Sequence, residues 1–251
     1  MENALIQNPH LKTEPRLLSI SEMETGTDQD YHYDPDQCHL FLLKNTPFQN
    51  DLVFNRCYKL LPDVRQEKIN RLRNRNDQNA SLAAGLLLHH LLTTHGYCES
   101  DLSYNQYGKP YLDTISEFYV NLSHCSDLAV CAFFSSEVGV DAEKFESADL
   151  GIAKHYFTSR ERNQILTSTD PIRYFYDYWV LKESYLKAKG IGLNMALDEF
   201  EIIVEKKIEV FENNHKMPFS FALKQFDDYS LAVCIQGILP HISYYETSIS
   251  L

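Results

Sequence analysis

The chain has 251 residues and a mass of 29.1 kDa, enough for one large domain or two small ones with buried cores. Its 35 acidic and 23 basic residues give a formal net charge of −12, which argues against binding to nucleic acid or to anionic membranes. The N-terminus has no signal-peptide pattern, and the six cysteines form no CxxC pair. We therefore expect a cytoplasmic protein with reduced thiols and no structural zinc.

The elements of the first half of the chain follow from polarity and apolar period. Residues 1–37 are polar and acidic without a period, which predicts an acidic N-terminal extension or exposed loop. The following segments predict, in chain order, a strand at 38–43, a charged helix at 63–78, a buried helix at 82–94 with Ser81 as its N-cap, a turn at 105–110, and a strand at 128–134.

Residues typical of helix ends mark the boundaries more clearly in the second half of the chain. A long helix is predicted over 171–189, because Pro171 stands at its first turn and Gly190 follows its end. Around it the pattern predicts a strand at 137–143, helical segments near 150–156 and 158–167, and strands at about 199–211, 217–226 and 229–236.

One short sequence occurs twice. Leu128-Ala129-Val130-Cys131 is repeated as Leu231-Ala232-Val233-Cys234, and each copy follows a polar turn that contains aspartate. Such runs suit any buried strand, but each copy comes late in a block of helix and strands about a hundred residues long, a plausible subdomain size. We therefore expect an α+β fold of two related halves, 38–136 and 137–251, with a ligand between them.

The acidic charge is unevenly distributed. Residues 51–110 hold eight basic and six acidic residues, and Arg65, Lys68, Arg71, Arg73 and Arg75 fall within eleven positions. A cationic region in an acidic protein could bind a small anionic ligand, or could be a solvated helix face, which charge alone favours.

Two acidic motifs could bind a cation. Asp141 and Glu143 would lie on one face of a strand, where carboxylates two residues apart repel each other unless a cation such as Mg²⁺ lies between them. Taken alone, such a pair is more often an exposed strand end. Glu183 and Lys187 stand four residues apart on an aromatic-rich helix, where they could be an ordinary ion pair or could complete a metal–phosphate site, with one or two lysines of that helix.

Two further segments could bind phosphate. Ser123 and His124 end a strand, and Lys109 stands in a rigid Gly-Lys-Pro turn, although a turn cap and a surface turn are the commoner interpretations. The P-loop, Rossmann and α/β-hydrolase motifs are absent from the sequence.

These motifs resemble, in their order and spacing, those of the 4′-phosphopantetheinyl transferases of the larger, monomeric, surfactin-synthetase-activating type. The resemblance runs from about residue 50 to 236, and rests on four segments: Gly108-Lys109-Pro110, Asn121-Leu122-Ser123-His124, Gly139-Val140-Asp141-Ala142-Glu143, and Trp179-Val180-Leu181-Lys182-Glu183-Ser184 with Lys187. Residues 1–37 have no counterpart in it. It implies a pseudo-dimer of two α+β halves, with coenzyme A in the cleft between them.

The resemblance also implies roles for individual residues. Asp141, Glu143 and Glu183 would hold Mg²⁺ against the pyrophosphate of coenzyme A, and Lys187 would contact the same pyrophosphate. The remaining contacts with coenzyme A would come from Lys109, Ser123 and His124, from Arg65 and Lys68 at the 3′-phosphate, and from Ser81.

The implied reaction needs no protein nucleophile. A serine of an apo acyl or peptidyl carrier protein attacks the β-phosphate of coenzyme A and expels 3′,5′-ADP, while Glu183 takes the serine proton directly or through a water. The pattern leaves two alternatives open, a Mg²⁺-dependent nucleotide phosphohydrolase and a non-catalytic module that binds coenzyme A or carrier proteins. The sequence does not indicate which carrier protein or biosynthetic pathway is served.

Overall fold

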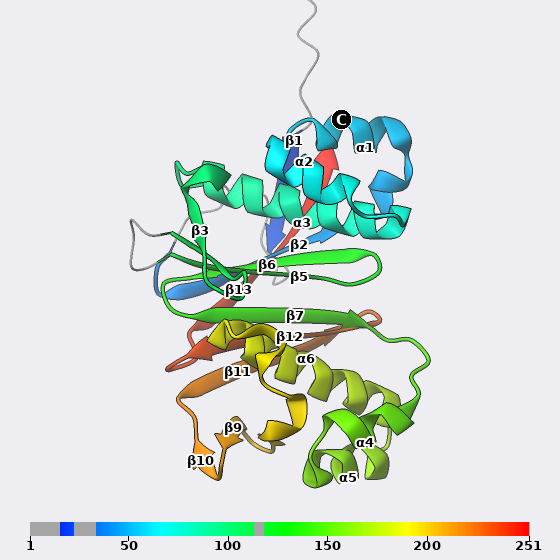
Figure 1. Cartoon of the computed structure of the whole chain (residues 1–251), viewed down its shortest axis with the longest axis vertical. Helices are drawn as coiled ribbons and strands as arrows, with labels where there is room; N and C mark the ends of the chain where they lie inside the picture. The colour runs from blue at the N-terminus through cyan, green and yellow to red at the C-terminus, as the bar shows by residue number, and fades with distance from the viewer. Residues whose placement is uncertain (1–15, 23–33, 113–117, 251) are drawn as a thin grey trace, which may run out of the picture.

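The computed structural model describes residues 16–22, 34–112 and 118–250. Its elements form four layers, which are stacked along the long axis in Figure 1 as helices, sheet, sheet and helices. Most of the predicted N-terminal extension, 1–15 and 23–33, lies outside the described residues, whereas 16–22 form a strand.

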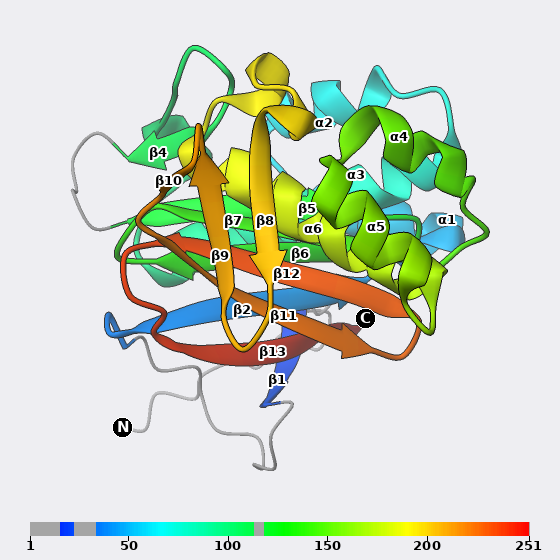
Figure 2. The ribbon, with the colours of Figure 1, turned by 90° about the horizontal axis from the view of Figure 1, so that it is seen from below.

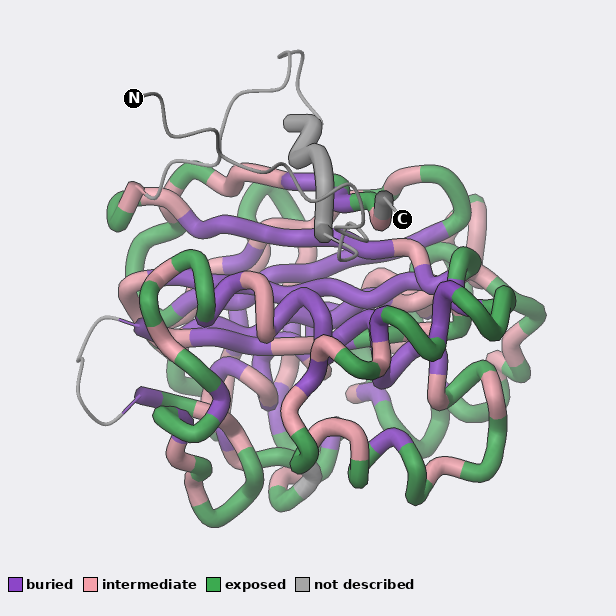
Figure 3. Tube along the Cα trace, turned by 90° about the horizontal axis from the view of Figure 1, so that it is seen from above, coloured by how far each residue is buried: buried purple, intermediate pink, exposed green. Residues whose placement is uncertain are grey.

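Two sheets form the middle of the molecule. In the described chain, the first sheet has seven strands, in the spatial order β1 (Arg16–Glu22), β13 (His241–Ser250), β2 (Gln37–Lys44), β6 (Leu128–Phe134), β5 (Tyr119–His124), β4 (Pro110–Leu112) and β3 (Leu102–Tyr104). The second sheet consists of β11 (Phe219–Phe226), β12 (Tyr229–Gln236) and β7 (Val138–Lys144). The central strands β2, β6, β7 and β12 are buried along most of their length (Figure 3).

Helices cover the outer face of each sheet. The first sheet is covered by α1 (Asp51–Tyr58), α2 (Asp63–Asn70) and α3 (Arg75–Thr94), and the second by α4 (Ala153–Tyr156), α5 (Ser159–Thr167) and α6 (Pro171–Lys189). A hairpin of β8 (Phe200–Val204) and β9 (Ile208–Glu212), which the short β10 (His215–Lys216) extends, lies beside α6 in Figure 2.

The repeated tetrapeptide occupies equivalent places in the two halves. It lies in β6, between β2 and β5, and in β12, between β7 and β11. Leu128 and Val130 face the core between the sheets, and so do Leu231 and Val233. The alternate positions, Ala129 with Cys131 and Ala232 with Cys234, face the helices. The alternation of side chains along a strand thus produces the same layering twice.

The turns before the two copies are equivalent as well. The carbonyl oxygen of Asp127 accepts a hydrogen bond from the Asn45 N–H after β2, at 2.9 Å. The carbonyl of Asp228 accepts one from the Phe145 N–H after β7, at 2.7 Å. The fold is therefore an α+β pseudo-dimer, as expected from the repeat.

The C-terminal strand departs from this symmetry. β13 runs parallel to β2 and antiparallel to β1, so the end of the chain returns to the first sheet. The division into 38–136 and 137–251 stays a prediction. No helix within the described part of the chain is both long and apolar enough to cross a membrane.

The predicted helix boundaries near Ser81 were wrong. The chain breaks at 71–74 rather than before Leu82, and α3 begins at Arg75 because the Asn74 side chain accepts a hydrogen bond from the Asn76 N–H. Ser81 lies in the second turn of α3, where it cannot act as an N-cap. The predicted strand at 199–211 is the β8–β9 hairpin.

Candidate active site

Two pockets lie at the seam where the first sheet meets the second half. They share Leu122 of β5 and Lys187 of α6. The Asn121 side chain joins the two sheets at this point, because its Oδ1 accepts a hydrogen bond from the Val140 N–H of β7 at 2.9 Å. The cleft between the halves is therefore lined by both of them.

The first of the two pockets, which we name the acidic pocket, has a volume of about 580 Å³. It brings together Ser123 and His124 from β5, Asp141 and Glu143 from β7, and Glu183 and Lys187 from α6. These six residues come from three of the four motifs found in the sequence. Tyr156, Trp179 and Leu197 form its apolar wall.

The approach of α6 to β7 depends on Gly139. A Cβ atom at this position would lie 2.1 Å from the Ser184 carbonyl oxygen and 2.3 Å from the Ala188 nitrogen. Only glycine therefore lets the helix backbone lie directly on the strand. Because Asp141 lies on the same face of β7 as Gly139, this contact places its carboxylate beside the side chains of α6.

Asp141 is the centre of the acidic pocket. Its side chain is only 5 % exposed, and its Oδ1 accepts hydrogen bonds from Ser123 Oγ at 2.7 Å and from Lys187 Nζ at 2.6 Å. The other carboxylate oxygen, Oδ2, is buried and has no hydrogen-bond partner in the structure. A buried, unpartnered carboxylate oxygen is costly in free energy, and it is therefore a position suited to a cation.

Burial and a neighbouring carboxylate raise the pKa values of two acids in the pocket. Burial, followed by the charge of Asp141, raises the pKa of Glu143 to about 7, and the same two causes raise the pKa of Glu183. Desolvation and the neighbouring cations Lys187 and Lys68 lower the pKa of His124, so its imidazole is neutral at pH 7. The pocket thus holds an excess of negative charge that a cation would relieve.

A dedicated metal cage is not found. Within residues 16–22, 34–112 and 118–250, no group of three or more histidine, cysteine or carboxylate side chains is arranged so that it could hold a metal ion. Mg²⁺ does not need such a cage, because it is usually bound through one or two carboxylates, substrate phosphates and water. The carboxylate oxygens here and the unpartnered Oδ2 of Asp141 fit that mode of binding.

The second of the two pockets, which we name the basic pocket, has a volume of about 260 Å³. Four cations line it: Arg65 and Lys68 from α2, Lys109 from the β3–β4 turn, and Lys187 from α6. Burial and the adjacent Arg65 lower the pKa of Lys68. This pocket therefore concentrates positive charge next to the acidic pocket, a combination suited to a polyanion bound with a metal ion.

Besides Lys187, which pairs with Asp141, two more of these cations already have protein partners. Arg65 pairs with Glu99, and Lys109 pairs with Glu137 and donates a hydrogen bond to the Ala188 carbonyl oxygen at 2.7 Å. Lys109 thereby holds the C-terminal turn of α6 against the first half, which the sequence did not predict. Asn105, also unpredicted, acts with it, because its Nδ2 donates to the Gly190 carbonyl oxygen at 2.7 Å.

Two residues considered in the sequence analysis lie elsewhere. Ser81 is not among the residues that line either pocket, and its contact with coenzyme A stays a prediction. Lys182 is fully buried on the far side of α6, paired with Glu161, so of the two lysines considered on this helix only Lys187 lies in the pockets.

Leu197 and Tyr156 are pocket residues that the sequence did not reveal. Both are apolar side chains in irregular or short helical segments, and no spacing rule marks such positions. Only the packing of the segment after α6 against α4 brings them to the pocket.

Comparisons with known proteins match this arrangement. The model of the 4′-phosphopantetheinyl transferase superfamily matches residues 137–234. The chain is 28 % identical over 178 residues to the 4′-phosphopantetheinyl transferase Sfp of Bacillus subtilis strain 168, which covers 68 % of this chain and 80 % of that protein. It is 28 % identical over 189 residues to the 4′-phosphopantetheinyl transferase gsp of Aneurinibacillus migulanus, covering 72 % and 79 %.

Among solved structures, the holo-[acyl-carrier-protein] synthase of Neisseria meningitidis matches with a TM-score of 0.36 and 17 % identity, over 41 % of this chain and 98 % of that one. The sequence matches extend well beyond the acidic motifs, into both halves of the fold. The chain is therefore similar to the 4′-phosphopantetheinyl transferases over most of its length, and these matches support an Sfp-like transferase.

Proposed function

We propose that the protein transfers the 4′-phosphopantetheine group of coenzyme A to a serine of an apo acyl or peptidyl carrier protein, releasing 3′,5′-ADP, and that it acts as a monomer. The observation that carries this proposal is the pairing of the two pockets through Lys187, which is salt-bridged to Asp141 and lines both. Coenzyme A is a polyanion with a central pyrophosphate, so it suits a site with cations on one side and carboxylates for Mg²⁺ on the other.

Asp141, Glu143 and Glu183 are the carboxylates among which Mg²⁺ would bind, through one or two of them together with phosphate oxygens and water. When bound, the ion would neutralise charge on the pyrophosphate oxygens during phosphoryl transfer. Asp141 is the strongest candidate of the three, because its Oδ2 has no other partner. Burial, followed by the charge of Asp141, raises the pKa values of Glu143 and Glu183, and a bound cation would oppose both effects.

Side chains of the pocket would stabilise charge, contact phosphate oxygens and accept a proton. Lys187 Nζ would stabilise the charge that develops on the pyrophosphate, while Ser123 and His124 would contact phosphate oxygens from β5. The serine oxygen of the carrier protein forms a bond to the β-phosphorus, and the bond from that phosphorus to the bridging oxygen breaks. The electron pair leaves with 3′,5′-ADP, and the serine proton passes to Glu183, whose carboxylate lies in the same pocket.

The direct test is mass spectrometry of apo carrier proteins after incubation with the protein, coenzyme A and Mg²⁺. We expect a phosphopantetheine adduct on serine, formed together with 3′,5′-ADP, and no adduct when a chelator removes Mg²⁺. Hydrolysis of coenzyme A without an adduct would indicate the phosphohydrolase alternative. Binding of coenzyme A without either product would indicate a non-catalytic module.

A prediction for the basic pocket concerns Lys68. We expect Lys68→Met to weaken binding of coenzyme A about tenfold, and binding of its 3′-dephospho form much less, because one cation–phosphate contact is lost only in the first case. Isothermal titration of both ligands measures this. Lys68 is a cleaner choice than Arg65, whose removal would leave the buried Glu99 without its partner.

Arg71→Gln is the control for this prediction. It removes a neighbouring cation that pairs only with exposed Glu67 on the same helix and does not line the pocket. Equal losses of affinity for the two ligands in the Lys68 variant would remove this residue from the 3′-phosphate.

A further inference from the structure

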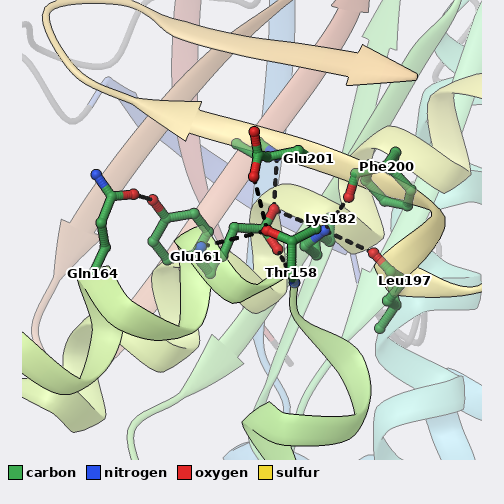
Figure 4. A network of polar contacts seen from close by, with 9 residues as sticks. Thr158, Glu161, Gln164, Lys182, Leu197, Phe200 and Glu201 are labelled. Atoms are coloured by element: carbon green, nitrogen blue, oxygen red, sulfur yellow. Dashed lines mark hydrogen bonds and ion pairs between the residues drawn. The ribbon is translucent and has the colours of Figure 1, made fainter. Parts of the chain in front are cut away.

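A second polar network lies behind the acidic pocket, on the opposite side of α6. Figure 4 shows Lys182 at its centre, between Glu161 of α5 and the segment that leads into β8. Both side chains of this ion pair are completely buried, and their charged atoms are 2.8 Å apart. A buried pair of this kind contributes little net stability, so its presence calls for another explanation.

The hydrogen bonds of Lys182 are complete. Its ammonium group has three protons and three acceptors, namely Glu161 Oε1, the Leu197 carbonyl oxygen at 2.7 Å and the Phe200 carbonyl oxygen at 2.8 Å. The same nitrogen lies 4.2 Å from the centre of the Phe200 ring. The direction of the side chain is therefore fixed from several sides at once.

Glu161 is held equally firmly. Its Oε1 also accepts from the Ile202 N–H at 2.7 Å, and its Oε2 accepts from the Thr158 N–H at 2.8 Å, which closes the N-terminal cap of α5. The carboxylate thus connects the start of α5, the middle of α6 and the middle of β8.

Two groups of the acidic pocket are direct neighbours of this network. Glu183 follows Lys182 on α6, where successive side chains point about 100° apart, so the position of Lys182 sets the rotation of the helix that carries Glu183 and Lys187. Leu197 offers its carbonyl oxygen to Lys182 and is itself part of the pocket wall.

We infer that the Glu161–Lys182 pair is a positioning device, which fixes the rotation of α6 and the place of Leu197 and thereby sets the acidic pocket for transfer. Neither residue touches the substrate; both act through Glu183, Lys187 and Leu197. The kinetic part of this inference rests on the proposed function. A shift of about 1 Å at a reacting group can lower a rate about a hundredfold, so a small rotation of α6 is sufficient.

The test uses the double variant Glu161→Gln/Lys182→Met. It removes both charges together, so that no lone charge stays buried, and the glutamine oxygen can still accept from the Ile202 N–H. We expect kcat for carrier-protein labelling to fall ten- to a hundredfold and KM for coenzyme A to change less than threefold, because the cations of α2 are untouched.

A second measurement does not depend on activity. Trp179 is the only tryptophan of the sequence, lies on α6 less than one turn before Lys182, and lines the acidic pocket. We expect its quenching by acrylamide to change at least 1.5-fold in the double variant. Glu161→Gln alone leaves the Lys182 charge buried without its partner, so it should change both values in the same direction and by at least as much.

The control is Arg160→Gln/Glu205→Gln. It also removes one ion pair that starts on α5, but this pair is exposed and does not involve α6. We expect wild-type kinetics and quenching from it. Should the wild-type protein itself transfer nothing, the proposed function fails, and the quenching of Trp179 still tests the inference.

Two results would overturn the inference. One is a folded double variant with wild-type quenching, or with wild-type kcat. The other is a double variant that does not fold, because the pair would then serve the stability of the second half rather than the setting of α6.

Discussion

Asp141→Asn is expected to fold as the wild type does and to label a carrier protein at least about a thousandfold more slowly. The amide oxygen can still accept from Ser123 Oγ and Lys187 Nζ, so the free energy of unfolding should change by only about 1 kcal/mol. The charge is lost, however, and with it the affinity of the buried Oδ2 position for a divalent cation. Mass spectrometry of labelled carrier protein and thermal unfolding measure the two effects.

Asp177→Asn is the matched control for this prediction. Asp177 is also an acid at the outer sheet–helix interface of the second half, but its carboxylate accepts from Ser230 and Gln225 and lines neither pocket. We expect it to retain labelling. Labelling at the wild-type rate by the Asp141 variant would remove this residue from the site.

Gly139→Ala is expected to impair both stability and transfer. The added methyl group would meet backbone atoms of α6, and backbone cannot swing aside as a side chain can. We expect a loss of about 3 kcal/mol in the free energy of unfolding, from overpacking, and a fall of about a hundredfold in kcat, because α6 carries Glu183 and Lys187 away from Asp141. Urea unfolding and labelling kinetics measure these losses.

Gly85→Ala provides the comparison in the other half. Gly85 lies in α3, and a Cβ there would first meet the end of the flexible Leu61 side chain at 3.0 Å. This substitution should change the free energy of unfolding by about 1 kcal/mol at most, since alanine also favours the helix. Equal behaviour of the two glycine variants would contradict the close contact of α6 with β7.

The long helix shows what can be read from local sequence. Its predicted bounds, 171–189, are those of α6, because its signals are local: the Asp170 side chain caps it, Pro171 begins it, and Gly190 ends it with a φ of 65°. The break between α2 and α3 was misplaced because both Asn74 and Ser81 are good N-cap residues, and only the surrounding packing selects between them.

The final strand shows what cannot be predicted from local sequence. The return of β13 to pair with β2 joins positions about 200 residues apart, and no local pattern specifies such a partner. Likewise, nothing local shows that Lys109 holds the end of α6 or that Lys182 pairs with Glu161. A lysine has the same sequence signature whether it binds a ligand or a buried carboxylate.

The sequence alone determined which groups this protein can use, namely three carboxylates and a group of cations. It also determined a repeated strand, and the order of these features resembles one enzyme family. Strand alternation and helix punctuation are local properties, so they can be read without coordinates. Tertiary structure alone decided which charges meet. Asp141 and Lys187 are 46 residues apart, and they pair because Gly139 admits α6 to β7. Lys182, five residues before Lys187, faces the other side of the same helix and pairs with Glu161 instead.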